Sequence, residues 1–247
     1  MPFEIAEASL VGQRDENQDR TVALVSDRAA LIAAIDGMGG HANGGKAAEV
    51  ARAVMVDAFA TQPLPLFDPL GFLHLTLGRA HREVVAIGSS LPMEQRPRAT
   101  CAVCLVQDGS AYWAHLGDSR IYHLRGGSAK VRTRDHSHVE QLLRDGLIRE
   151  DEVHAHPMRN YVECCLGGDR SLPEMSMSRR RALCPGDVLL VCTDGLWANL
   201  SEADIAACTR ADAHPLGDEV AGLAHRAVTA SAPHSDNTTL VALRWTR

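Results

Sequence analysis

Residues 30–40 read Ala-Leu-Ile-Ala-Ala-Ile-Asp-Gly-Met-Gly-Gly, so an apolar, strand-like run ends in the carboxylate of Asp36. Three other stretches share this design: residues 110–116 lead to Asp118, residues 188–192 lead to Asp194, and Asp236 opens the run 238–243. Strands bring residues that are distant in sequence to one edge of a sheet, so these carboxylates can meet. Carboxylates that meet repel one another and resist ionisation. Mg²⁺ and Mn²⁺ prefer oxygen ligands and relieve that repulsion. The pattern therefore predicts a metal-dependent enzyme.

The composition narrows the class of protein. Of the 247 residues, 45% are apolar and 23% are charged, which is ordinary for a globular domain. A net charge of −6 argues against a surface built for nucleic acid. No run approaches the roughly 18 apolar residues of a membrane span, and the first residues lack the regions of a signal peptide. Seven cysteines, several inside apolar runs, suit buried reduced thiols. We expect a cytoplasmic protein with no nucleic-acid or membrane partner.

The order of the expected elements favours an α+β fold. Runs rich in Val, Ile, Leu and Thr predict strands near residues 3–9, 20–26, 30–35, 99–106, 110–116, 119–124, 175–183, 187–193 and 237–244. Helical periodicity predicts helices over about 45–60, 69–88 and 220–228. Helices do not alternate strictly with strands, which favours antiparallel sheets covered by helices. The tight turn within 112–124 predicts a hairpin of antiparallel neighbours. We expect one domain, 1–247, with a helical insertion or flap at about 135–175.

A motif near the N-terminus completes an ordered series. Arg14, Asn17, Gln18 and Asp19 fit the pattern R-x-x-N-[EQ]-D just before an expected strand. The pieces 36–41, 117–120, 193–196 and 236–237 follow it in the chain. Each piece is weak by itself, but together and in this order they resemble the bacterial PP2C-like (PPM) metal-dependent protein serine/threonine phosphatases. The resemblance covers nearly the whole chain.

The resemblance implies both a fold and an activity. The implied fold is a four-layer α-β-β-α sandwich, in which helices flank a central antiparallel β-sandwich and metals lie at one end between the sheets. The implied activity is hydrolysis of phosphoserine and phosphothreonine on proteins, by a water that bridges two Mn²⁺ or Mg²⁺ ions, with a third ion in some members. Phosphorylated proteins and a cognate serine/threonine kinase are the implied partners, and we expect a monomer.

The candidate site residues have chemical reasons for their roles. Two ions about 3.5–4 Å apart can activate a shared water and clamp the reacting oxygens. Asp36 would bridge the ions, with the Gly37 carbonyl as a second oxygen because glycine allows unusual backbone geometry. Asp194 and Asp236 would complete one metal site, and Asp19 would lie in the other site's coordination sphere. Arg14 would hold the phosphate, because a guanidinium matches phosphate oxygens bidentately.

For several other positions the sequence allows more than one role. The resemblance implies that Asp118 joins Asp194 around a third, weaker metal, whereas a simple turn aspartate is the alternative. Gln18 stands where many relatives have glutamate, and Met38 stands where eukaryotic relatives carry a histidine proposed as general acid. A leaving serine alkoxide needs a proton. His41 or a metal-bound water could supply it.

Several rival patterns share the same stretches. Residues 40–46 fit the G-x-x-x-x-G-K frame of a nucleotide-binding P-loop, but Ala47 lacks the hydroxyl that binds Mg²⁺. Residues 37–42 fit a dinucleotide fingerprint loosely, without a later acidic partner in a parallel unit. The spacing from Cys164 to Arg170 resembles cysteine-based phosphatases, but Glu163 would raise the pKa of the thiol. A PP2C-like regulator without activity is the remaining alternative, although the intact aspartates argue against it.

Two further clusters could suggest metal sites. Cys101 and Cys104 have C-x-x-C spacing, but alternation within a strand would point their thiols to opposite faces, so we expect core residues. Four histidines in the flap could bind a metal, whereas a solvated helical surface is the simpler interpretation: His136, His138, His154 and His156.

Overall fold

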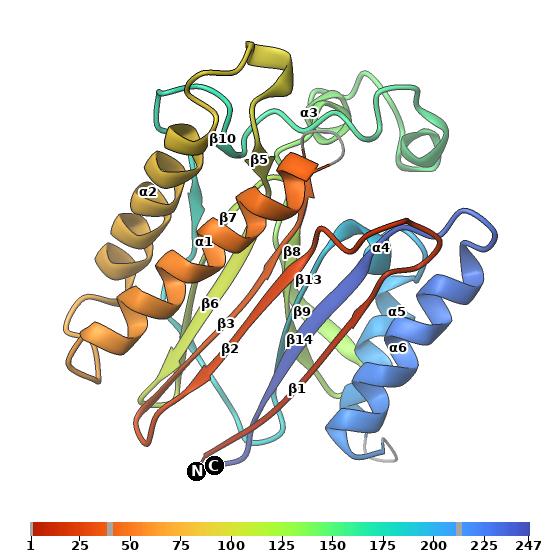
Figure 1. Cartoon of the computed structure of the whole chain (residues 1–247). Helices are drawn as coiled ribbons and strands as arrows, with labels where there is room; N and C mark the ends of the chain where they lie inside the picture. The colour runs from red at the N-terminus through yellow and green to blue at the C-terminus, as the bar shows by residue number, and fades with distance from the viewer. Residues whose placement is uncertain (1, 39–41, 211–213) are drawn as a thin grey trace.

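Two antiparallel sheets face each other, and helices cover the outer side of each sheet (Figure 1). The computed structural model describes residues 2–38, 42–210 and 214–247. One outer layer holds α1 (Ala42–Thr61) and α2 (Pro69–Ile87). The other holds α4 (Asp194–Trp197), α5 (Glu202–Ala206) and α6 (Leu216–Ala230). This is the four-layer α+β sandwich that the sequence predicted.

Each sheet is built from strands that are distant in sequence. The first has the order β1 (Phe3–Leu10), β14 (Thr238–Trp245), β13 (Val188–Cys192), β8 (Arg120–Arg125) and β9 (Ser128–Arg132). The second has the order β7 (Ser110–Leu116), β6 (Cys101–Gln107), β3 (Ala29–Ile35) and β2 (Arg20–Val25), and the short strands β11 (Ser176–Met177) and β12 (Arg181–Ala182) pair with β7. A small third sheet joins β10 (Leu166–Gly167), β5 (Arg98–Ala99) and β4 (Gly37–Met38).

The remaining helical elements are the helix α3 (His138–Arg144) and the 3₁₀ turns η1 (Met93–Gln95), η2 (Glu150–Ala155) and η3 (Ala207–Thr209). Of these, α3 and η2 lie in the flap. Figure 1 shows α3 above the end of the sandwich, next to the β5 and β10 edge. No helix among residues 2–38, 42–210 and 214–247 is long and apolar enough to cross a membrane.

Three apolar layers separate the four structural layers. Strand β3 shows why its sequence is continuously apolar: Leu31, Ala33 and Ile35 face the helices α1 and α2, while Ala30 and Ile32 face the other sheet. Successive side chains of a strand point to opposite faces, so a strand buried on both sides needs apolar residues throughout. The third layer lies between the first sheet and α4–α6. The apolar runs that lead to the aspartates are therefore central strands.

The same alternation explains the C-x-x-C spacing. Cys101 lies in the layer under α1 and α2, and Cys104 lies in the layer between the sheets. Both thiols are buried and unbonded, and burial raises their pKa. The prediction that they are core residues is confirmed.

The expected hairpin within 112–124 is wrong. Strand β7 pairs with β6 in the second sheet, whereas β8 pairs with β13 and β9 in the first. Both strands are almost fully buried, and each forms its ladder hydrogen bonds with strands of its own sheet. The turn between them crosses from one sheet to the other. Gly117 permits this with φ +90°, where an added Cβ would lie 2.6 Å from Thr100. The crossing places Asp118 at the end of the sandwich.

Most predicted elements are present with shifts of a few residues at their ends. Two differences stand out. Residues 175–183 form only the two short strands β11 and β12, because this exposed segment runs along the edge of β7. Strand β9 was not predicted, because its sequence, with Lys130 and Arg132, is polar and lies on the sheet edge. In both segments solvent exposure removes the apolar alternation on which the prediction depends.

Candidate active site

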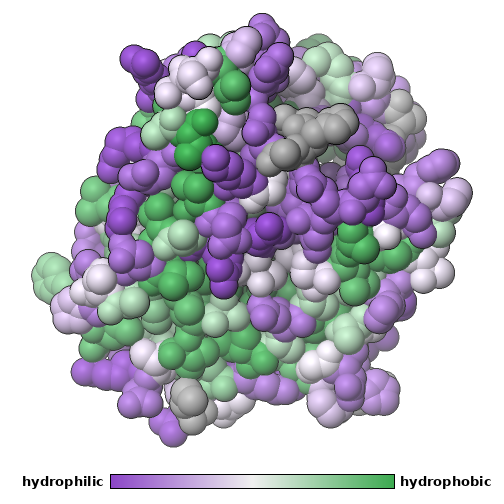
Figure 2. Space-filling view, in the orientation of Figure 1, coloured by the Kyte–Doolittle hydropathy of each residue, from purple (hydrophilic) through white to green (hydrophobic). Residues whose placement is uncertain are grey.

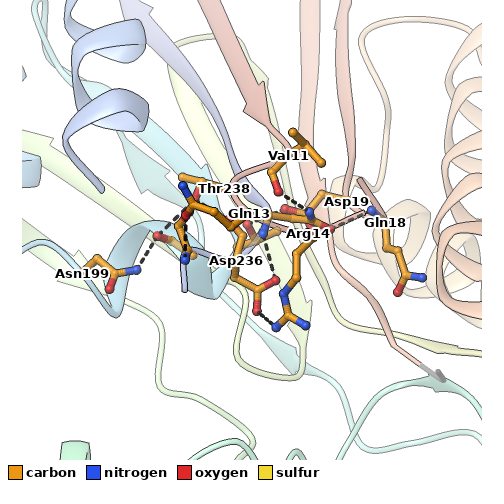
Figure 3. Close-up of polar contacts among 12 residues, drawn as sticks. Val11, Gln13, Arg14, Gln18, Asp19, Asn199, Asp236 and Thr238 are labelled. Atoms are coloured by element: carbon orange, nitrogen blue, oxygen red, sulfur yellow. Dashed lines mark hydrogen bonds and ion pairs between the residues drawn. The ribbon is translucent and has the colours of Figure 1, made fainter. Parts of the chain in front are cut away.

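The loops that carry Arg14 and Asp236 are joined by hydrogen bonds (Figure 3). The Asn237 side-chain amide donates to the carbonyls of Val11 at 2.9 Å and Glu16 at 3.0 Å. Its oxygen accepts from the amide of Gln18 at 2.8 Å. The asparagine thus uses its donors and its acceptor to hold the loop before β2 against the loop before β14. This fixes Arg14 opposite Asp236, and their side chains form an ion pair of 2.7 Å.

Asp19 lies behind this pair, at the start of β2. Its side chain is almost fully buried and accepts a hydrogen bond of 2.9 Å from the Thr193 hydroxyl. Burial, with a contribution from the negative charges of Asp194 and Asp236, raises the pKa of Asp19 to about 7. A carboxylate in this position is costly unless a cation compensates its charge.

Asp36 has the central position in the cluster. It ends β3, where its carbonyl accepts from the Thr100 amide at 2.9 Å. Burial raises the pKa of Asp36 well above its ordinary value, and four other aspartates each raise it further: Asp19, Asp194, Asp118 and Asp236. Because the charges of all four other aspartates act on Asp36, it is the best placed of the five carboxylates to interact with more than one cation.

Gly37 is required here by space. An added Cβ would lie 2.2 Å from the Gly44 carbonyl of α1 and 2.8 Å from the carbonyl of Gln18. Its φ is not in the left-handed region, so the expected reason for this glycine, unusual backbone geometry, is wrong. The close approach of α1 to the end of β3 is what excludes a side chain.

Asp118 and Asp194 complete the group from the other sheet. Burial raises the pKa of Asp118 to about 8, and the charges of Asp194 and Asp135 contribute. Asp194 is the first residue of α4 and keeps part of its surface open, yet reduced contact with water and the charge of Asp236 raise its pKa to about 6. The five aspartates therefore come from five separate segments and influence one another's charge.

The donor set suits hard divalent cations. All five groups are carboxylates, and each of the four most enclosed ones resists ionisation because of its surroundings. Within residues 2–38, 42–210 and 214–247, no three acidic, histidine or cysteine side chains close on one point as a preformed cage. The carboxylates instead lie near enough for their charges to act on one another. Added positive charge would lower all of their pKa values together.

A cavity of about 890 Å³ extends outward from this cluster. Its inner end is lined by Arg14, Asp118, Asp194 and Asp236, and its outer part lies between α3 and the α4–α5 segment. Figure 2 shows that the face over this end of the sandwich is largely hydrophilic, whereas the sides are more apolar. The site is thus a wet, polar cleft open to a large substrate.

The family model for protein phosphatase 2C matches residues 8–229. The chain belongs to the protein phosphatase 2C family. Serine/threonine protein phosphatase PstP of Mycobacterium tuberculosis is 34% identical over 219 residues, which are 87% of this chain and 39% of PstP. The chain thus spans well under half the length of that relative. Protein phosphatase PhpP of Streptococcus pneumoniae is 30% identical over 246 residues, 98% of each chain.

Solved structures agree with the sequence relatives. The serine/threonine phosphatase of S. agalactiae has a TM-score of 0.89 and 27% identity, covering 99% of this chain and 100% of that one. The catalytic domain of PstP, in complex with two manganese ions, has a TM-score of 0.82 and 26% identity, with 99% of each chain covered. The predicted family and fold are confirmed.

The rival patterns lose their structural context in a protein phosphatase 2C fold. P-loops and dinucleotide sites need a parallel strand pair, but β3 is antiparallel to both of its neighbours, β2 and β6. Burial and the charge of Glu163 raise the pKa of the Cys164 thiol, opposite to what a nucleophilic cysteine needs. His41 and Gly40 lie outside the described residues.

Three of the four flap histidines have separate partners, and the side chain of His154 lies outside the described part of the structure. His136 bonds to Ser176 at 2.8 Å, His138 to Glu163 at 3.2 Å, and His156 accepts from the Met158 amide at 3.2 Å. Each of these three imidazoles thus has a different partner. The simpler interpretation, structural contacts on the flap surface, agrees with this arrangement.

Sequence reasoning assigned no role to a group beside Asp118. Arg120 forms a bidentate pair with Asp135, at 2.8 and 2.7 Å, and its guanidinium stacks 3.5 Å from the centre of the Trp197 ring. The Trp197 indole donates to the Asp118 carbonyl at 2.9 Å. These contacts hold the base of the flap to the Asp118 turn. Arg120 belongs to the piece 117–120 of the motif series, but its contacts with Asp135 and Trp197 gave no signal in the sequence, because these partners lie on other parts of the chain.

Proposed function

We propose that this chain hydrolyses phosphoserine and phosphothreonine esters on proteins with Mn²⁺ or Mg²⁺. The observation that carries the proposal is the gathering of five aspartates at one end of the sandwich, where burial and mutual repulsion raise the pKa of four of them despite partly opposing contacts. Asp36 would contribute to both ion sites, with the Gly37 carbonyl as a second oxygen ligand. Asp194 and Asp236 would complete one site, and Asp19 would contribute to the other.

Asp118 is proposed as the ligand of a third, weaker ion with Asp194. Its buried position and its effect on the Asp36 pKa support a role in the cluster over that of a plain turn residue. Bound ions would supply the activation of water and the neutralisation of phosphate charge. The protein's own task is to place the substrate against them.

Arg14 is proposed to bind the phosphate. Its side chain is 60% exposed and lines the cavity beside Asp236 and Asp194. Arg14 donates to Asp236 through Nη2. Because the guanidinium is planar and rigid, this contact also fixes the directions of Nη1 and Nε. A guanidinium held in this way can grip phosphate oxygens with little loss of conformational freedom. His41 or a metal-bound water remains the proposed source of the proton for the leaving alkoxide.

The proposal extends to partners and compartment. A phosphorylated protein is the substrate, and the kinase that made the phosphate ester is the counterpart in the cell. The seven cysteines are all unpaired thiols, four of them buried, which supports a reducing compartment such as the cytoplasm. A monomer with its cleft open to solvent is part of the same proposal.

Phosphate release from a phosphothreonine peptide tests the proposal. We expect turnover by the metal-stripped protein to be restored by Mn²⁺ and abolished by EDTA, and to resist thiol alkylation. Tight binding of the phosphopeptide without turnover in Mn²⁺ or Mg²⁺ would identify the inactive regulator instead. Turnover that persists in EDTA but is lost in Cys164→Ser would reject metal catalysis altogether.

A further inference from the structure

A second cavity, of about 530 Å³, lies next to the catalytic cleft. Asn160 lines both cavities, so the flap segment around this residue separates them. Figure 1 shows β5 and β10 beside α2, at the same end of the molecule as α3, and this is where the second cavity opens. We call it the Met38 pocket, after the residue that connects it to the catalytic centre.

The floor of the Met38 pocket continues the strand that carries the catalytic aspartate. Met38 pairs with Arg98, and Arg98 pairs with Gly167, so these three residues form one row of the small sheet. The next row begins with Gly37, directly after Asp36. A strand rises about 3.3 Å per residue, which puts the floor about 7 Å along the strand from Asp36. A neighbouring residue of a phosphopeptide spans that distance.

The charged groups at the rim already have partners within the chain. Glu163 pairs with His138 at 3.2 Å, and Arg98 donates to the Met93 carbonyl at 3.2 Å. Asp169 accepts from the Ser171 amide at 3.1 Å. Because these three charged side chains already have partners, a charged ligand would gain little from binding to them.

The apolar groups of the same pocket are exposed to solvent. Tyr161 is 55% exposed, Leu172 is 47% exposed and Met93 is 44% exposed, and all three line the pocket together with Met38 and Pro173. Large apolar side chains that gather around a cavity mark a binding surface more often than isolated ones do. A pocket of this volume and chemistry suits an apolar group.

We propose that the Met38 pocket binds an aliphatic side chain of the substrate, one or two residues from the phosphorylated threonine. This rests on the proposed phosphatase function and adds a substrate preference to it. The two methionines are flexible and polarisable, so the pocket accepts leucine or methionine alike. Acidic residues are disfavoured there because Glu163 and Asp169 stand at the rim.

Matched phosphothreonine peptides test this preference. Each pair differs only by leucine or serine at one of the two positions before or after the phosphothreonine. At one of these positions we expect kcat/KM in Mn²⁺ to be about ten-fold higher for leucine, mainly through KM. Equal values for every pair would overturn the inference while leaving the phosphatase function standing. Absence of metal-dependent turnover for all peptides would overturn the proposed function itself.

Variants locate the preference in the pocket. Leu172→Ser and Met93→Ser should reduce the leucine preference to less than about three-fold. Both side chains are largely exposed, so the variants should fold. Leu147→Ser is the matched control, because Leu147 belongs to the same flap, is 69% exposed and lines neither cavity. If Leu147→Ser weakens the preference as much as Leu172→Ser does, the preference arises outside the Met38 pocket and the assignment is wrong.

Discussion

Strand β13 carries an aspartate at each end, and the two carboxylates have opposite surroundings. Asp187 precedes the strand, with a side chain that has no exposed surface. Arg125 donates to it at 2.6 Å, His123 pairs with it at 2.8 Å, and the Cys184 amide donates at 2.9 Å. Asp194 follows the strand and faces Asp236 and the rest of the acidic cluster.

The pKa values show what this difference means. Burial alone would raise the pKa of Asp187, but Arg125, the Cys184 amide and His123 outweigh it and lower the pKa. For Asp194, burial and Asp236 raise the pKa to about 6, and the Gly195 amide and Arg14 only partly oppose them. The carboxylate of Asp187 therefore stabilises the fold. The carboxylate of Asp194 destabilises the metal-free fold but is suited to bind a cation. Such a division is expected where function needs an unfavourable arrangement of charges.

The largest effect should follow from removing charge at the functional end. We expect Asp36→Asn and Asp194→Asn each to lower kcat/KM more than about 100-fold, because metal affinity and water activation decline together. Their thermal midpoints in EDTA should equal or exceed that of the wild type, because repulsion in the cluster is reduced. Isothermal titration with Mn²⁺ and thermal melts measure the two properties.

Asp27→Asn is the matched control for Asp36→Asn. Asp27 is exposed in the turn before β3, at the opposite end of the strand from Asp36. It should keep wild-type turnover and Mn²⁺ affinity. Unchanged Mn²⁺ binding in Asp36→Asn and Asp194→Asn would remove both residues from the metal site.

The opposite outcome is expected at the structural end. Asp187→Asn leaves Arg125 and His123 without their anion, so we expect a loss of about 3 kcal/mol in the free energy of unfolding. That corresponds to a fall of about 6–12 °C in Tm for a domain of this size. Urea unfolding measures it. Turnover per folded molecule and Mn²⁺ affinity should be unchanged, and a large change in either would mean that the two ends of β13 do not act separately.

The pH dependence of stability should have opposite signs at the two ends. In the metal-free protein the raised pKa values, about 7 for Asp19 and about 8 for Asp118, mean that the folded state binds more protons than the unfolded chain. Stability is therefore lost as pH rises from 5 to 8, through the pKa values of both groups. Asp187 has a lowered pKa, so its contribution is lost only as pH falls below about 4.

Urea unfolding at pH 5 and pH 8 in EDTA measures the first of these effects. Saturating Mn²⁺ should reverse the slope, because cations bind the ionised carboxylates of the folded state. A metal-free protein that is equally stable at both pH values would show that the cluster is not strained by its own charge.

The sequence predicted the functional end of the sandwich better than the structural end. Apolar runs that stop at an aspartate can be read from the chain, because strand burial and the following polar residue are local features. The partners of Asp187 cannot be read in this way. Arg125 and His123 lie on β8, and only the antiparallel register of β8 with β13 brings them to Asp187.

The wrong hairpin has the same cause. The residues around Gly117 indicate a tight turn, but which sheet each flanking strand joins is decided by pairing with β6 and β13. The role of Trp197 was missed for the same reason. Local chemistry predicted which residues are unusual, and long-range register decided what they touch.

Arg14 combines both kinds of information: a local sequence motif predicted the residue, and the structure adds its partner, Asp236. We expect Arg14→Ala to lower kcat/KM on a phosphothreonine peptide about ten- to a hundred-fold, the value of a charge-assisted hydrogen bond to phosphate. If the grip is equal in the ground and transition states, the loss appears mainly in KM. Stability should change little, because the Arg14–Asp236 pair is exposed on both sides and such pairs contribute less than about 1 kcal/mol.

The contact between Arg14 and Asp236 also bears on metal binding. Arg14 competes with a cation for the Asp236 carboxylate, so Arg14→Ala should bind Mn²⁺ as tightly as the wild type or more tightly, whereas Asp236→Asn should bind it more weakly. Arg14→Lys keeps the charge without the planar fork and should recover only part of the lost KM. Arg28→Ala, in the exposed turn before β3, is the control and should match the wild type. Wild-type kinetics in Arg14→Ala would make Arg14 a partner of Asp236 alone, and the phosphate would then depend on the metals for its binding.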